Sequence, residues 1–145
     1  GGIAVGMEFR EIYARTQKAF QAERLQNDRT VVSTDWATTN LGHTVPWTHS
    51  EPTAEDQAMI ERGDFTALRE AIRVQRIFIN SEQTFTVPAT GLFTFEARVE
   101  SMDDPTLPLI LFHLLVGFIN GEKIVQTNYQ LLLDVLGMSY LRSTY

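Results

Sequence analysis

The sequence predicts an α+β fold, in which N-terminal helices are followed by an antiparallel β-sheet or β-sandwich. In the N-terminal half, apolar side chains recur at steps of three and four, the period of a helix. From Ile77 onward they alternate with polar side chains, the period of a strand. With 145 residues, of which 43 % are hydrophobic, the chain suffices for one domain with one core. We therefore expect a single domain, 1–145, made of an N-terminal helix (1–30), a long loop (31–52), two short helices (53–73) and an antiparallel sheet (74–145).

One apolar face predicts the first helix, over residues 7–26. Glu11 and Arg15 lie mainly away from this face and form an i,i+4 ion pair in the favourable order. The apolar face consists of Phe9, Ile12, Tyr13, Thr16 and Phe20.

The long loop that follows carries candidate binding residues. Trp36 and Trp47 are the two tryptophans of the chain, and either they stack on a sugar ring or a peptide, or they anchor the loop to the core. His43 and His49, with acidic residues nearby, either bind zinc or another divalent ion or are two solvated loop histidines. Carbohydrate is therefore one partner class that the loop leaves open.

Two short helices are predicted from their ends. Thr53 is a good N-cap, and Asp56 three residues later comes close to a capping box. Gly63 suits the end of this helix, which would span residues 54–62. Asp64 then caps a second helix to about residue 73.

Alternation predicts the strand that spans residues 93–100. One face should be buried and the other wet, as in an antiparallel sheet with one solvated side. The expected buried residues are Phe93, Phe95, Ala97 and Val99. The expected solvent-facing residues are Thr94, Glu96, Arg98 and Glu100.

A β-hairpin is predicted around Asn120-Gly121, because both positions tolerate positive φ. Residues 108–119 and 122–133 should pair antiparallel, with Ile119 opposite Glu122 and His113 opposite Asn128. The first strand would direct one set of side chains to the core: Ile110, Phe112, Leu114, Val116 and Phe118.

The opposite face of that first strand is also apolar. It carries Leu109, Leu111, Leu115 and Ile119, with a polar patch at His113, Gln126, Asn128 and Gln130. Leaving such side chains in water is costly, so we expect the N-terminal helix or another subunit to cover them. His113 is either satisfied across a subunit contact or a general base or ligand inside a cavity.

The stretches "FTVPATGLFTFEARV" and "LLVGFINGEKIV" give a partial resemblance to known folds. Over residues 84–125, a strand ending in Pro, a Gly turn, an aromatic alternating strand and a later Asn-Gly turn are similar to trimeric jelly-roll heads of the complement and tumour-necrosis-factor-like type. The same pattern occurs in phage and viral appendage domains. The resemblance implies a β-sandwich that oligomerises and binds or builds without catalysis. The helices predicted before residue 74 depart from it.

Composition excludes several function classes. A net charge of −6 and the absence of a basic run disfavour nucleic acid as a partner. The chain has no cysteine and therefore no thiolate nucleophile or cysteine zinc site. The longest apolar run, 107–119, is shorter than the twenty or so residues that a membrane-spanning helix needs, so we expect a soluble protein. No catalytic, phosphate-binding or dinucleotide-binding motif is present, and we expect no cofactor.

These observations favour a non-enzymatic structural or assembly protein that self-associates or binds another structural protein. A virion or phage appendage is one setting that fits. One alternative is a small cone-shaped α+β enzyme or ligand-binding protein with His113 in its pocket. Another is a carbohydrate-binding module that uses Trp36 and Trp47. The proposed contact surface is Leu109, Leu111, His113, Leu115, Gln126 and Asn128.

Overall fold

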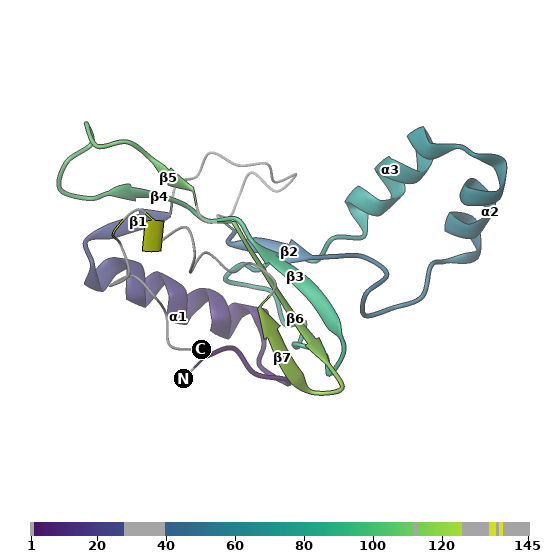
Figure 1. Ribbon diagram of the computed structural model, residues 1–145, viewed down its shortest axis with the longest axis horizontal. Helices are drawn as coiled ribbons and strands as arrows, with labels where there is room; N and C mark the ends of the chain where they lie inside the picture. The colour runs from purple at the N-terminus through teal and green to yellow at the C-terminus, as the bar shows by residue number, and fades with distance from the viewer. Residues whose placement is uncertain (1, 28–39, 112, 126–133, 136, 138–145) are drawn as a thin grey trace.

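A computed structural model confirms the mixed α+β fold (Figure 1). It describes residues 2–27, 40–111, 113–125, 134, 135 and 137. The helices of this part are α1 (Phe9–Ala22), α2 (Ala54–Arg62) and α3 (Phe65–Val74). Its strands are β1 (Leu25–Asn27), β2 (Gly42–Thr44), β3 (Gly91–Phe95), β4 (Arg98–Ser101), β5 (Ile110–Leu111), β6 (Leu114–Ile119) and β7 (Glu122–Val125).

The strands form two antiparallel sheets, ordered β1-β4-β5 and β2-β3-β6-β7. One long two-stranded ribbon runs through both sheets. Strands β3 and β4 follow each other along one side of it, and β5 and β6 follow each other along the other side. Its register is the same in both sheets, because Phe95 faces Leu114 and, three residues along each chain, Arg98 faces Leu111. The expected single strand over 108–119 is therefore wrong: it is divided into β5 and β6. Each end of the ribbon pairs with a different third strand, so the twisted ribbon cannot stay in one sheet.

The predicted hairpin is confirmed over the described residues. Asn120 and Gly121 have φ of 52° and 88°, as the turn requires. Ile119 faces Glu122, and the pairing continues in the expected register to Val116 opposite Val125. Residues 126–133 lie outside the described residues, and with them the expected pairing of His113 with Asn128.

Helix α1 packs against the sheet face that carries Phe93. The Phe9 ring lies 5.9 Å from the Phe93 ring, and the Phe93 ring stacks on Phe118 at 6.2 Å. The buried core also contains Ile12, Leu41, Ile79, Val87, Ala97, Val99 and Val116. This corrects two expectations: α1 covers the core face instead of the face of Leu109, and Thr94, expected in solvent, is buried.

The helix ends follow the predicted local chemistry for α2 and α3. The Asp56 N–H donates to Thr53 Oγ1 at 3.1 Å, and the Thr53 N–H donates to Asp56 Oδ2 at 2.9 Å, which completes the capping box. Gly63 has φ of 68°, and the Ala67 N–H donates to Asp64 Oδ1. We call residues 53–75 the helical arm, since in Figure 1 α2 and α3 extend away from both sheets.

Two short strands were not predicted. The helix expected over 7–26 ends at Ala22, and after Arg24 at φ 57° the chain enters β1 beside β4. The segment expected as a loop over 31–52 contains β2, which pairs with β3. A Cβ on Gly42 would lie 2.0 Å from the Thr94 carbonyl oxygen, so glycine permits this close approach. Both strands depend on distant partners that no local pattern reveals.

Candidate functional site

A polar cluster lies on the sheet face opposite Phe93. In the register of β2 and β3, His43 faces Thr94, and both residues are buried. The Glu96 carboxylate lies between two imidazoles: its Oε2 is 3.6 Å from His43 Nε2, and its Oε1 is 3.3 Å from His113 Nε2. We call His43, Arg76, Thr94, Glu96 and His113 the base cluster, where base means the root of the helical arm and not a chemical base.

The hydrogen bonds of His43 define its tautomer. Its Nδ1 lies 2.7 Å from the Thr44 carbonyl oxygen, which only accepts, so Nδ1 carries the hydrogen. In neutral His43, the lone pair of Nε2 then faces Glu96. Burial is the main cause that lowers the pKa of His43, and the charges of Arg76 and His113 act in the same direction. The Thr44 carbonyl and the Glu96 charge oppose this shift of the pKa.

Two further polar atoms of the base cluster are buried. Thr94 Oγ1 and Arg76 Nε have no hydrogen-bond partner among the residues that the structure describes. Buried polar atoms without partners are costly. Within the base cluster, the side chain whose pKa these surroundings lower is the imidazole of His43.

The proposed metal pair is not brought together. His43 belongs to the base cluster, whereas the His49 ring packs on Phe85 at 5.3 Å. Burial lowers the pKa of His49, and its Nδ1 has no partner among the described residues. Over that same part of the chain, no group of three or more His, Cys, Asp or Glu residues could hold a metal ion.

Trp47 is hydrogen-bonded to the helical arm where the arm joins the sheet. Its indole N–H donates to Gln75 Oε1 at 3.1 Å, and Gln75 Nε2 donates to both oxygens of the buried Asp56 at 2.9 Å. The backbone N–H of Thr53 is the main cause that lowers the pKa of Asp56. These contacts are those of an anchor between a loop and two helices. Trp36 lies outside the described residues.

The proposed contact surface is only partly assembled. Leu109 and Leu111 are 38 % and 61 % exposed, whereas Leu115 is half-buried beside Thr94. Ile110, expected in the core, is 50 % exposed, and its strand β5 pairs with β4 alone among the described strands. Gln126, Asn128 and Phe112 lie outside the described residues. We call Leu107, Leu109, Ile110 and Leu111 the β5 patch.

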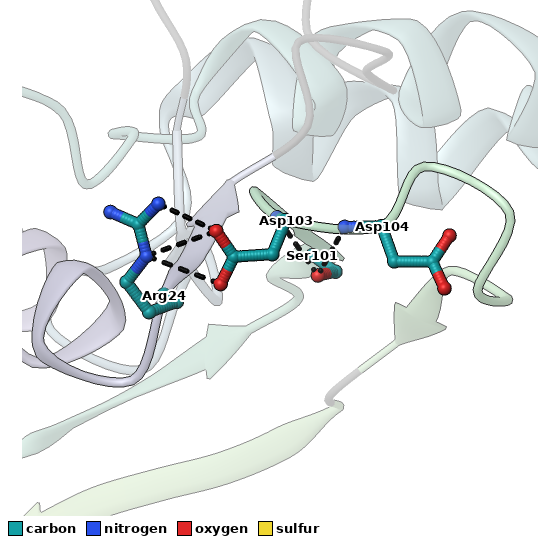
Figure 2. A network of polar contacts seen from close by, with 4 residues as sticks. All are labelled: Arg24, Ser101, Asp103 and Asp104. Atoms are coloured by element: carbon teal, nitrogen blue, oxygen red, sulfur yellow. Dashed lines mark hydrogen bonds and ion pairs between the residues drawn. The ribbon is translucent and has the colours of Figure 1, made fainter.

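A second polar network joins the end of α1 to the loop after β4 (Figure 2). Arg24 Nε lies 3.1 and 3.2 Å from the two Asp103 oxygens, and Arg24 Nη2 lies 2.6 Å from Asp103 Oδ1. The N–H groups of Asp103 and Asp104 both donate to Ser101 Oγ. The hydrogen bond from Arg24 is the main cause that lowers the pKa of Asp103. All of these groups serve the turn itself, so the network is structural.

The sequence did not reveal Glu96 and Arg76 as members of the base cluster. Glu96 was assigned to a solvated face by its alternation with Phe95 and Ala97. The ribbon register places Glu96 opposite His113, and β2 then brings His43 to the same carboxylate. To find this cluster, the sequence would have had to show that β2 pairs with β3. A strand of three residues is too short to show such a pairing.

Comparisons with protein-family models, with curated proteins and with solved structures found no match. No helix in the described part of the chain has the length and apolar character needed to cross a bilayer.

Proposed function

We propose that this protein is a structural or assembly component that works by self-association through the β5 patch. The observation that carries the proposal is an exposed apolar edge: Ile110 and Leu111 are 50 % and 61 % exposed, and Leu107 is 54 % exposed. Among the described residues, β5 pairs with β4 alone. Exposed apolar edges favour pairing with another chain.

A second copy of the chain is the occupant that fits this patch. The chain has a net charge of −6, so two copies repel each other over most of their surfaces. Residues 105–121 contain no Asp, Glu, Lys or Arg, and the β5 patch lies within this uncharged segment. Two copies related by a two-fold axis can bring these segments together without opposing like charges.

Side-chain burial should supply most of the contact energy. Pro108 has no N–H to donate to a neighbouring strand, which limits a continuous ladder along this edge. Fully burying a leucine or isoleucine side chain stabilises a contact by about 1.5–3 kcal/mol. The resemblance of residues 84–125 to oligomeric jelly-roll heads supports the same kind of function.

The test is Leu111→Asp, followed by mass measurement in solution by light scattering. We expect the wild-type chain to be oligomeric and the variant to be a folded monomer, because a charge would then enter the uncharged contact. Phe65→Asp is the matched control: it places the same charge at an equally exposed apolar residue, 66 % accessible, on the helical arm.

The same measurements can refute the proposal. A wild-type chain that stays monomeric at high concentration would exclude self-association. Dissociation by Phe65→Asp but not by Leu111→Asp would move the interface to the helical arm. Leu115→Asp should unfold the chain instead of dissociating it, since Leu115 is half-buried on β6 next to Thr94.

A further inference from the structure

The helical arm is inserted between two backbone segments that lie side by side. Leu41 N–H donates to Ile79 O, Ile79 N–H donates to Gly42 O, and Thr44 N–H donates to Ile77 O, each at 2.9 Å. Strand β2 ends at Thr44, Val45 N–H still donates to Leu92 O at 2.8 Å, and the chain returns beside β2 at residue 77. A fourth bond, from Ile77 N–H to Thr44 Oγ1 at 3.1 Å, joins these three in closing the base of the arm.

The base cluster lies at this closure. His43 is in the middle of the outgoing segment and forms a β-bridge with Phe78 of the returning segment, with ring centroids 5.7 Å apart. Arg76 directly precedes the returning segment. Glu96, between β3 and β4, lies 3.6 Å from His43 and 3.3 Å from His113, which lies between β5 and β6 on the other side of the ribbon.

The closed base suits a neutral His43. His43 is 9 % exposed, and a buried imidazolium loses most of its hydration. Arg76, just after the arm, acts on His43 with a positive charge, and His113 adds a second one from the ribbon whenever it is protonated. Glu96 is the only one of these facing groups with a negative charge, and its nearer oxygen is 3.6 Å away. Burial outweighs the attraction of Glu96, so a proton on His43 favours an open base in which water reaches the ring.

We propose that the base cluster is a proton-responsive joint, in which proton uptake by His43 opens the base of the helical arm and lets the arm move relative to the sheets. Opening requires loss of the four bonds between residues 41–44 and 77–79. The helices of the arm stay folded, because their capping box and the packing of α2 against α3 do not involve the base cluster.

Hydrogen exchange of the full chain at pH 7.5 and pH 5.5 tests this joint, after correction for the intrinsic dependence of exchange on pH. We expect the amides of Leu41, Thr44 and Ile79 to exchange faster at the lower pH, by up to about tenfold, because an exposed imidazole with an ordinary pKa of about 6.5 takes up most of a proton between these two pH values. The amides of Phe9 and Val87, which bond outside the base, should change only as far as the stability of the whole chain changes.

Three variants separate the joint from general acid instability. His43→Asn keeps a donor for the Thr44 carbonyl but cannot take up a proton. In this variant, exchange of the amides at the base of the arm should not respond to pH. Glu96→Gln removes the attraction that holds a charged His43 ring in the closed base, so the midpoint of opening should move to higher pH. Arg76→Gln removes a repulsion that destabilises the closed base when the ring is charged, so the midpoint should move to lower pH. His49→Asn is the control, and it should keep the response of the wild-type chain.

A general loss of stability would move the midpoint of opening in the same direction in both charge variants. Opposite shifts of the midpoint therefore test the joint even if His43→Asn fails to fold. In that case the His43 ring is titrated by NMR in Glu96→Gln and Arg76→Gln. The proposal is overturned if the base amides of the wild-type chain do not respond to pH, if His43→Asn keeps the full response, or if the two charge variants shift the midpoint in the same direction.

Discussion

The two ends of the long ribbon have similar alternating sequences but different surroundings. At the β3–β6 end, Phe93, Val116 and Phe118 are buried against α1. At the β4–β5 end, Ile110 and Leu111 remain half or more exposed. Alternation therefore indicates which side chains share a face, but a face is buried only where another element covers it. The β4–β5 end lacks such a cover over β5 among the described residues, which is why we place self-association there.

The largest expected effect compares one residue from each end. Phe93→Ala should lower the free energy of unfolding by about 3–5 kcal/mol, because it leaves a cavity between Phe9 and Phe118. Leu111→Ala should change the stability of the monomer by no more than about 0.5 kcal/mol. Urea denaturation at a dilute protein concentration measures both. Equal losses would mean that β5 is covered as completely as β6.

The next effect concerns β2, the strand that extends the buried end. Gly42→Ala should lower the free energy of unfolding by at least about 2 kcal/mol, because the added Cβ meets the Thr94 carbonyl and φ is positive. Gly121→Ala has open space around its Cβ and should cost only about 1 kcal/mol, from its positive φ. If Gly42→Ala were the milder change, β2 could not lie as close to β3 as the structure shows.

A smaller effect is expected from pH at the junction of the two ends. Burial lowers the pKa of His43 in the folded chain below its ordinary value of 6.5. The unfolded chain then binds the proton more strongly, so stability falls as the pH falls through and below about 6.5. His43→Asn should reduce this acid loss without abolishing it, because the pKa of His49 is lowered in the same direction. A series of denaturation curves between pH 8 and pH 5 provides the comparison.

The smallest effect is expected at the exposed end, where Arg24 pairs with Asp103 (Figure 2). Both side chains are more than half exposed, so water and salt screen the pair. Arg24→Ala should be milder than Phe93→Ala and Gly42→Ala, and added salt should reduce its effect further. Thermal unfolding at low and high ionic strength checks this. A loss as large as that of Phe93→Ala would show that this end depends on the ion pair.

Local chemistry alone determined several elements of this protein. The caps at Thr53, Gly63 and Asp64 predicted α2 and α3 to within a residue, and Asn120-Gly121 predicted the hairpin and its register. In each case the interacting groups lie a few residues apart, so the sequence contains both partners of every bond. The α+β class followed from the change of apolar period along the chain.

Only the tertiary structure decided the base cluster and the coverage of the ribbon. Gly42 faces Phe95, Leu25 faces Ser101, and His43 meets Glu96, although none of these pairs is close in sequence. Such contacts form only after the intervening chain has folded, and β1 and β2 are too short to show a period of their own. For the same reason the sequence predicted the shared faces of Phe93 and Ile110 but could not predict that α1 covers one end of the ribbon and leaves β5 exposed.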